Sequence, residues 1–284
     1  MSKKHLMMLV VFIFSIFAFS ACAGDSSFVA DREINVISRE AGSGTRGAFI
    51  ELLAIVKDGA DQTSVYADVA NGTSIVITSV ANNMYSIGYI SIGSLGENVK
   101  SLSVNNFAPT AENIVNGTYP LFRTFFIVIK DDENPLRDDF ISFILSAQGQ
   151  EIAAQNYVPV WDDFESYLSP GLSGTVVVAG STSVYPVMSR LAEAYMSFNP
   201  GIYVEVHSMG SSAGINQTIE GNVDIGMSSR NLNEKELEQI KAIAIAYDGL
   251  AIIVNPENPV TNLSLDELSG IFVGNITRWS NFID

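Results

Sequence analysis

The chain has 284 residues, of which 47% are apolar and 16% charged, so it can bury the core of one large domain or of two ordinary ones. Its 31 acidic residues outnumber its 15 basic residues by 16, which argues against the basic footprint of a nucleic-acid-binding protein. With one cysteine and two histidines, the chain has no disulfide framework and no multi-histidine metal centre, and we expect no metal and no cofactor.

The first 22 residues have the pattern of an export signal. A basic start precedes an apolar run over residues 6–19, which is too short to span a bilayer comfortably because about 20 apolar residues are needed. Small residues then lead to Cys22, in a pattern that resembles a bacterial lipobox, although lipoboxes usually carry Leu in place of Phe19. We predict a lipoprotein signal peptide over residues 1–22 and lipidation of Cys22. A cleaved signal with an incidental cysteine is the alternative.

Strand-like and helix-like segments alternate in the first half of the chain, after a polar tether over residues 23–32. We expect strands at 34–38, 74–80, 87–92 and 125–129, and helices at 48–56 and 136–154, the second of them bent near Gly149. Residues 161–174 then shift in composition. Their acids, proline and glycines predict a linker or an exposed crossover.

The second half shows the same alternation. We expect strands at 175–178, 204–206, 223–227 and 242–254, the last interrupted at Asp248-Gly249, and helices at 183–198, 211–220, 234–241 and 264–272. An apolar stripe predicts the core-facing side of helix 183–198, and it consists of Val184, Val187, Met188, Leu191, Tyr195 and Phe198. Strands that alternate with helices predict α/β architecture with largely parallel sheets.

Two motifs match enzyme signatures in form only. Residues 42–47 read G-x-G-x-x-G between a predicted strand and a helix, as in a dinucleotide-binding turn. An exported protein does not normally meet nicotinamide cofactors, so we disfavour that interpretation. Residues 210–214 read G-x-S-x-G, but no histidine follows Ser212 to act as its base, and His207 is too close in sequence. An esterase is therefore also disfavoured.

These two motifs and residues 178–183 are junctions at which a strand leads through Gly, Ser or Thr into a helix. The first N–H groups of a helix lack intrahelical partners, small residues let a ligand approach them, and the helix dipole favours an anion. Arg39 lies just ahead of one junction, and its planar guanidinium suits a tetrahedral oxyanion. We predict a single oxyanion site formed by the three junctions. Ordinary helix capping is the alternative for each junction alone.

Five segments of the chain resemble the PstS-type phosphate-binding proteins of bacterial phosphate ABC importers. They are AGSTSVYP with the helix that follows (179–200), GSSAGINQ through VDIGMSSR (210–230), YDGLAIIVNP through ITRWS (247–280), ISREAGSGTRGAF (37–49), and SIGYISIGSL with the segment up to Arg123 (86–123). The resemblance covers nearly all of the chain from about Ile34, except residues 161–174. It implies a two-lobed periplasmic-binding-protein-like fold of type II. Each lobe is expected to be a mainly parallel sheet flanked by helices, and the lobes to close on the ligand by hinge motion.

The order of these segments differs from that of the family, in which AGSTSVYP comes first and SREAGSGTR follows ITRWS. We therefore interpret the chain as circularly permuted, with the opened seam between Asp284 and about Glu33. A fragment of a tandem array is the alternative. The expected boundaries are 33–119 for the second part of lobe II, 120–160 for the second part of lobe I, 161–174 for the linker at the join, 175–246 for the first part of lobe I, and 247–284 for the first part of lobe II.

The resemblance implies a lipid-anchored, extracytoplasmic monomer that captures inorganic phosphate between its lobes, delivers it to the permease of an ABC importer, and performs no chemistry. The residues that match the family's phosphate-binding motifs are Arg39, Ser43, Gly44, Thr45, Thr182, Ser183, Ser211 and Ser229. Some members carry an aspartate at the position of Ser229, so a receptor for sulfate or another tetrahedral oxyanion stays open, as does a non-transport phosphate sensor. Glu40 is a further candidate acceptor and Arg230 a further candidate charge. A solvated partner of Arg39 and a surface ion pair are the respective alternatives.

Overall fold

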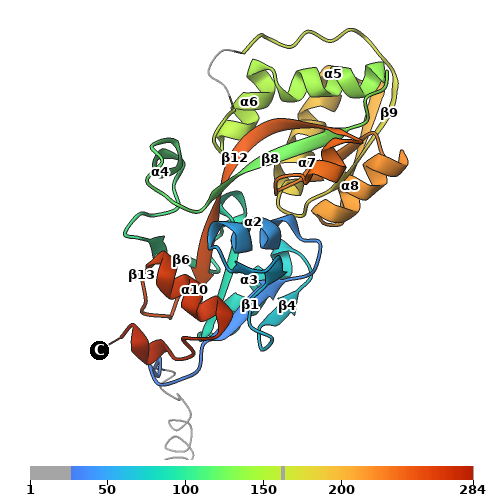
Figure 1. Ribbon diagram of the computed structural model, residues 1–284. Coiled ribbons are helices and arrows are strands. Elements are labelled where there is room, and N and C mark those ends of the chain that lie inside the picture. The colour runs from blue at the N-terminus through green and yellow to red at the C-terminus, as the bar shows by residue number, and fades with distance from the viewer. Residues whose placement is uncertain (1–26, 161–163, 284) are drawn as a thin grey trace, which may run out of the picture.

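Two lobes, each a sheet covered by helices, make up residues 27–160 and 164–283, which are the residues described by a computed structural model (Figure 1). We call residues 27–121 with 250–283 the lower lobe, and residues 122–160 with 164–249 the upper lobe, as they are drawn in Figure 1. The predicted signal peptide and Cys22 lie outside the described residues. Within the described ranges, no helix combines the length and the apolar character that a bilayer crossing requires.

The lower lobe is built from residues 27–121 and 250–283. Its elements are β1 (Asn35–Arg39), α2 (Gly44–Leu52), β2 (Val56–Lys57), β3 (Ala60–Asp61), β4 (Asp68–Ala70), α3 (Thr73–Ala81), β5 (Ser86–Ser91), η2 (Ile92–Ser94), β6 (Lys100–Ser101), β7 (Ser103–Val104), α4 (Ala111–Val115), β13 (Asn262–Leu263), α10 (Leu265–Val273) and η3 (Trp279–Asn281).

The middle of the chain forms the upper lobe. Its elements are β8 (Phe122–Ile129), α5 (Pro135–Ile144), α6 (Ala147–Ala154), β9 (Gly174–Gly180), α7 (Tyr185–Phe198), β10 (Ile202–Ser208), α8 (Ser211–Glu220), β11 (Ile225–Ser228), α9 (Glu234–Leu237) and the first part of β12 (Lys241–Val254).

One long strand joins the two lobes. The strand order is β10-β9-β11-β8-β12-β5-β1-β4, with parallel pairing on the outer sides and antiparallel pairing of β8 and β12 in the middle. β12 pairs with β8 as far as Gly249 and with β5 from Leu250 onward. The backbone therefore passes from one lobe to the other without leaving the sheet, and the predicted two-lobed α/β fold is confirmed.

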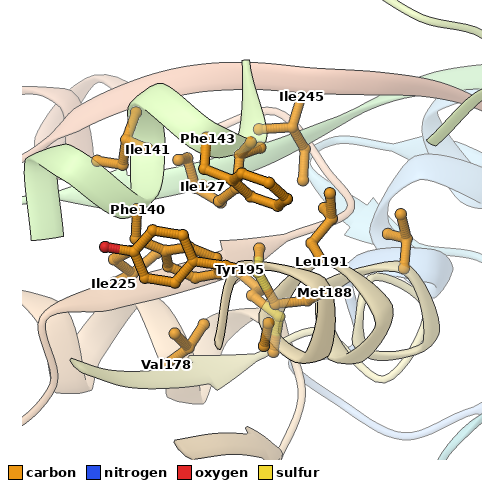
Figure 2. Packing of buried hydrophobic residues seen from close by; sticks show 14 of the residues in the cluster. Ile127, Phe140, Ile141, Phe143, Val178, Met188, Leu191, Tyr195, Ile225 and Ile245 are labelled. Carbon is orange, nitrogen blue, oxygen red and sulfur yellow. The ribbon is translucent and has the colours of Figure 1, made fainter. Parts of the chain in front are cut away.

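Each lobe has its own hydrophobic core. In the upper lobe, α7 packs Met188, Leu191 and Tyr195 against Phe140 and Phe143 of α5 (Figure 2). The stripe predicted on this helix is buried as expected at every position except Phe198, which is 46% exposed at the helix end. The lower lobe has a separate core in which Phe49 stacks on Tyr89 with ring centroids 3.8 Å apart.

The largest error in the predicted elements concerns residues 74–80, which form helix α3 and not a strand. Their β-branched composition favours a strand, but Val76 and Val80 are fully buried at a spacing of four residues while Ile75 is half exposed. Both valines lie against Gly88 of β5, where a Cβ would come within 2.8 Å of Val76. Packing on the sheet thus overrides local propensity.

Several smaller boundaries also differ from the predictions, among them that of α2, which spans Gly44–Leu52 and not 48–56. The helix expected at 136–154 is two helices that divide at Leu145 and not at Gly149, because the Ser146 hydroxyl caps α6 by accepting from the Gly149 N–H at 3.2 Å. Strand β12 runs through Asp248-Gly249 without interruption. The helix predicted at 234–241 ends at Leu237, and the strand begins at Lys241.

Residues 164–173, the described part of the predicted linker, carry no regular secondary structure but are fixed to the upper lobe. The Tyr167 side chain is buried there, and its hydroxyl donates to Asp139 Oδ2 at 2.8 Å. Tyr195 of α7 donates to the same oxygen at 2.6 Å. Asp139 therefore ties this segment and α7 together.

Loss of the Tyr195 hydroxyl should lower the stability of the protein. A hydrogen bond to a charged group contributes about 1.5–3 kcal/mol, so we expect Tyr195→Phe to reduce the free energy of unfolding by about 2 kcal/mol in urea titrations. Tyr203→Phe, at a position that is 58% exposed, is the control and should change stability by less than about 0.5 kcal/mol. Equal stabilities for the two variants would contradict the assigned role of Asp139.

The two ends of the described chain lie side by side in the lower lobe (Figure 1). Ile34 N–H donates to the Thr277 carbonyl at 2.8 Å, and Glu33 forms a β-bridge with Arg278. The Phe28 ring meets the edge of the Trp279 ring at 6.1 Å. Chain ends that pair in this way have the proximity that a circular permutation requires.

Candidate functional site

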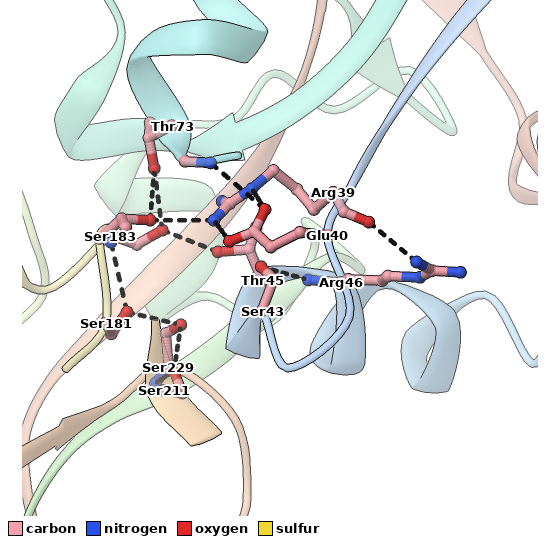
Figure 3. A network of polar contacts seen from close by, with 12 residues as sticks. Arg39, Glu40, Ser43, Thr45, Arg46, Thr73, Ser181, Ser183, Ser211 and Ser229 are labelled. Carbon is pink, nitrogen blue, oxygen red and sulfur yellow. Dashed lines mark hydrogen bonds and ion pairs between the residues drawn. The ribbon is translucent and has the colours of Figure 1, made fainter. Parts of the chain in front are cut away.

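Hydroxyl groups from the two lobes meet where the lobes touch (Figure 3). Thr45, at the start of α2 in the lower lobe, has its Oγ1 2.8 Å from Ser183 Oγ of the upper lobe. Thr73, at the start of α3, has its Oγ1 3.2 Å from Thr182 Oγ1. Three of these four side chains are at least nine-tenths buried, and Thr182 is partly buried. The helix starts of both lobes therefore converge on one small polar region.

Arg39 lies beside these hydroxyls at the end of β1 and is only 1% exposed. Its Nε and Nη2 each donate to a carboxylate oxygen of Glu40 at 2.7 Å, and Nη2 also donates to Thr182 Oγ1 at 3.0 Å. Nη1 is buried and has no hydrogen-bond partner among the described residues. A buried charged donor without a partner is costly, so this atom marks a place for an acceptor.

A second group of hydroxyls belongs to the upper lobe alone. Ser181 Oγ donates to Ser229 Oγ at 2.9 Å, and the Ser229 N–H donates to Ser211 Oγ at 3.2 Å. Gly44 of the lower lobe lies against this group, because a Cβ at Gly44 would be 2.2 Å from Ser211 Oγ and 2.6 Å from Ser229 Oγ. Since Gly44 directly precedes Thr45, the two groups of hydroxyls are neighbours.

Two glycines give these loops their shape. Gly180, at φ +143°, ends β9 so closely against β11 that a Cβ would lie 2.4 Å from the Met227 carbonyl oxygen. Gly210 precedes α8 at φ +92°, and its N–H donates to the Gly180 carbonyl at 2.9 Å. Both conformations exclude most side chains. The loops that start α7 and α8 are thereby held next to each other.

Nearly the whole sequence matches known proteins. Residues 23–148 and 166–283 fit the sequence profile of the PBP superfamily domain. The phosphate-binding protein PstS 2 of Streptococcus agalactiae serotype V is 41% identical over 290 residues, which span 98% of this chain and 99% of the relative. This chain belongs to the PstS phosphate-binding proteins. PstS 2 of Streptococcus pneumoniae serotype 4 is likewise 41% identical, over 98% of this chain and 99% of its own length.

A solved structure of a phosphate-binding protein has the same fold. The phosphate-binding protein of a phosphate ABC transporter from Streptococcus pneumoniae TIGR4 is 42% identical and superposes with a TM-score of 0.71, over 88% of this chain and 99% of that chain. The resemblance inferred from the sequence is thus confirmed. Because the streptococcal relatives match from end to end, they share the segment order of this chain. A permutation relative to other PstS proteins stays a prediction.

Most of the residues predicted for the PstS ligand site lie together, and one has a different partner. Arg39 and Thr45 of the lower lobe face Ser183, Ser211 and Ser229 of the upper lobe (Figure 3). Thr182, which accepts from Arg39, and Gly44, which lies against Ser211 and Ser229, belong to the same region. The Ser43 hydroxyl instead caps α2 by accepting from the Arg46 N–H at 3.3 Å. This hydrogen bond is an N-cap, and a contact between Ser43 and a ligand stays a prediction.

Sequence reasoning did not select Thr73 and Ser181. Thr73 was missed because the segment that follows it was predicted as a strand, so no helix start was expected there. Ser181 stands inside the AGSTS motif, and the signal was its position directly after Gly180. Its hydroxyl also accepts from the Ser183 N–H at 3.2 Å, which orders the loop at the start of α7.

The Tyr89 hydroxyl and a second arginine hold the backbone of Arg39 in place. The Arg39 N–H donates to the Tyr89 hydroxyl at 3.2 Å, and that hydroxyl lies 3.0 Å from Ser38 Oγ. Burial raises the pKa of Tyr89 to about 12, so the phenol stays neutral. Arg46 Nη1 donates to the Arg39 carbonyl at 2.9 Å. The backbone that carries the guanidinium is therefore fixed on both sides.

Arg230 lies at the edge of the site and is engaged in an ion pair. Its Nη2 is 2.8 Å from Glu236 Oε1 and donates to Ser212 Oγ at 3.2 Å. Its side chain passes within 3.2 Å of the position that a Cβ on Gly47 would take. The Ser212 N–H donates across the lobes to the Gly42 carbonyl at 3.1 Å. Within the described residues, no cluster of three or more His, Cys, Asp or Glu side chains has metal-site geometry.

We predict that Glu40 makes the stability of the folded protein sensitive to acid. Although partial burial opposes ionisation, the hydrogen bonds and charge of Arg39 hold the pKa of Glu40 below its ordinary value of 4.5. A carboxylate with a lowered pKa stabilises the folded state above the unfolded-state pKa, and this contribution is lost as the pH falls through the folded-state pKa.

We therefore expect the free energy of unfolding to fall below about pH 4.5, and to fall less steeply in Glu40→Gln. Urea titrations from pH 7 to pH 3 measure both slopes. Glu51→Gln, at an exposed position of α2, is the control and should keep the wild-type slope. Identical slopes for wild type and Glu40→Gln would show that the Arg39–Glu40 pair does not contribute to acid sensitivity.

Proposed function

We propose that the protein captures inorganic phosphate between its lobes and delivers it to the permease of an ABC importer. The observation that carries the proposal is the buried Arg39. Its Nη2 contacts Thr182 beside hydroxyls from both lobes, and its Nη1 lacks a partner among the described residues. The relatives that support it are named as phosphate-binding proteins, and the solved one as part of a phosphate ABC transporter.

The proposed mechanism is binding and closure without chemistry. Arg39 supplies the positive charge, and hydroxyls and helix-start N–H groups supply neutral donors in a region shielded from water. Since some donors come from each lobe, a tetrahedral anion contacts its full set only when the lobes are together. The ligand then stabilises the closed form by its differential affinity, and the permease is expected to recognise that form.

Isothermal titration calorimetry with phosphate and sulfate tests this function. We expect saturable phosphate binding at one site per chain and weaker sulfate binding. No heat with phosphate at 1 mM ligand, from protein shown to be folded, would contradict the proposal. Tighter sulfate than phosphate binding would favour the alternative receptor. The donors and acceptors of the site favour keeping that alternative. Ser229 offers a hydroxyl where a carboxylate would accept the proton of phosphate. Glu40 already accepts from Arg39 with both of its carboxylate oxygens.

We further propose an extracytoplasmic monomer that is anchored to the outer face of the cell membrane by lipid on Cys22. The pattern of residues 1–22 supports this, together with the family of the chain. We expect Cys22→Ala to move most of the protein from the membrane fraction to the soluble or secreted fraction. Cell fractionation with immunoblotting measures the shift. A variant that stayed wholly with membranes would contradict the lipid anchor.

The circular permutation and the linker boundaries at 160/161 and 174/175 are also proposals. For the two crossings between the lobes, expected at 119/120 and 246/247, we propose 121/122 and 249/250, because β12 pairs with β8 as far as Gly249 and with β5 from Leu250. Paired chain ends in the lower lobe support the permutation. So does the reduced match to PstS of Bacillus subtilis, which is 38% identical over only 110 residues, or 38% of this chain and 37% of the relative. A collinear relative of similar length would be expected to match further.

A further inference from the structure

A buried ion pair lies where the chain crosses between the lobes. Arg123 of β8 and Asp248 of β12 are paired in the sheet register, and Arg123 Nε donates to Asp248 Oδ2 at 2.9 Å. The Asp248 side chain is fully buried, and that of Arg123 is 4% exposed. One residue further along β12, the strand ends its pairing with β8 and begins to pair with β5. The pair therefore lies at the crossover between the lobes, which is the hinge about which we expect the lobes to close.

Each member of the pair also reaches one of the lobes. Asp248 Oδ1 accepts from Ser91 Oγ, at the end of β5 in the lower lobe, at 2.6 Å. Arg123 Nη1 donates to the Ser229 carbonyl at 3.3 Å. A continuous series of polar contacts thus runs from the lower lobe through both crossover strands to Ser229, whose hydroxyl belongs to the proposed phosphate site.

Stability alone is a weak reason for such a pair. Burying two charges is costly, and apolar residues of similar size often replace a buried ion pair without loss of stability. Burial raises the pKa of Asp248 to about 6, against the opposing charge of Arg123. Burial also lowers the pKa of Arg123, and the positive charge of Arg39 lowers it further although Asp248 opposes this.

We propose that Arg123 is a positioning residue of the anion site, which holds the Ser229 loop in its binding position and ties that loop to the hinge strands. The identity of the ligand in this inference rests on the proposed function. The position that the inference assigns to the Ser229 loop does not depend on that function. With Asp248 as its partner, Arg123 forms a neutral pair, so its effect acts through the hydrogen bond to the Ser229 carbonyl and not through added net charge.

The test is a double variant that removes the pair without leaving a lone buried charge. Arg123→Met/Asp248→Leu should remain folded in urea titrations but bind phosphate at least tenfold more weakly by calorimetry. In phosphate-free protein, hydrogen exchange of the Ser229 amide should become at least tenfold faster, because that N–H donates to Ser211 Oγ only while the loop is in position. A folded double variant with wild-type phosphate affinity and wild-type exchange at Ser229 would overturn the proposal.

Two further variants make the result specific. Arg123→Lys keeps the charge opposite Asp248 but cannot reproduce the guanidinium fork, so we expect normal stability with affinity several-fold weaker than wild type. This variant decides the matter if the double variant does not fold, and wild-type affinity in it would overturn the proposal. Arg137→Met/Asp132→Asn removes another arginine pair of the upper lobe, at α5, and should leave phosphate affinity unchanged.

Failure of the inference is distinguishable from failure of the proposed function. If the wild-type protein does not bind phosphate, the proposed function fails, and the amide exchange of Ser229 in the ligand-free variants still decides whether Arg123 positions the loop. If the wild-type protein binds phosphate and all Arg123 variants bind it equally well, the inference fails while the proposed function stands.

Discussion

Replacement of Arg39 by alanine should weaken phosphate binding by at least tenfold. A charged hydrogen bond in a dry site contributes about 1.5–3 kcal/mol, and a tenfold change in Kd corresponds to about 1.4 kcal/mol. The guanidinium is 1% exposed, so water cannot replace it without rearrangement of the site. Isothermal titration calorimetry of the variant with phosphate measures the loss.

The control for this variant must separate the site from general electrostatics, because the chain carries a formal charge of −16. Arg190→Ala removes the same charge from α7, where the side chain donates to Gln155 Oε1 at 3.0 Å away from the hydroxyl cluster. We expect its Kd for phosphate to stay within about twofold of wild type, since the Arg190 side chain is partly exposed and such charges are screened over about 10 Å. Equal affinities of Arg39→Ala and wild type would contradict the assigned site.

Replacement of Gly44 by alanine should prevent the lobes from closing. The added Cβ would lie 2.2 Å from Ser211 Oγ, 2.6 Å from Ser229 Oγ and 2.9 Å from Ser211 Cβ. A hydroxyl can rotate away, but Ser211 Cβ moves only if α8 moves with it. Gly44 is the first residue of α2 and has no positive φ, so alanine suits the helix itself. The clash therefore opposes closure and leaves each lobe's own fold intact.

We expect Gly44→Ala to bind phosphate at least tenfold more weakly while its urea unfolding stays close to wild type. Small-angle X-ray scattering with saturating phosphate should then give a larger radius of gyration for the variant than for wild type. Gly96→Ala is the matched control, because a Cβ at Gly96 has no neighbour within 4 Å among the described residues and should change neither quantity. Wild-type closure of Gly44→Ala would refute the tight interlobe contact.

Periodicity predicted the elements that bury one regular face. Helix α7 and helix α8 follow the expected spans closely, and the Ser264–Glu267 capping box is present at the start of α10. Periodicity failed for α3, because its run of β-branched residues is typical of a strand. That the segment is a helix is evident only from the structure, in which Val76 and Val80, four residues apart, are both buried against the sheet. Such a preference arises from tertiary packing, which a local pattern does not contain.

The residues of the candidate site also divide into those that the sequence predicts and those that it does not. Arg39, Thr45, Thr182 and Ser211 were selected because a glycine-rich junction at a helix start has a recognisable composition. Thr73 lacked that signal, since its helix was not expected. Arg123 lies within an apolar strand, and nothing in the sequence indicates that its guanidinium meets Asp248 and the Ser229 carbonyl more than 100 residues away. Long-range partners of this kind become visible only in the folded chain.

The central claim is that residues of both lobes surround one tetrahedral anion. Crystals grown with arsenate, which has the shape and charge of phosphate, test it most directly through anomalous diffraction at the arsenic edge. We predict one strong arsenic peak per chain. It should lie where the arsenate oxygens are within hydrogen-bond distance of Arg39 Nη1 and of the hydroxyls of Thr45 and Ser183. An arsenic peak on one lobe only, away from Arg39, would contradict the account.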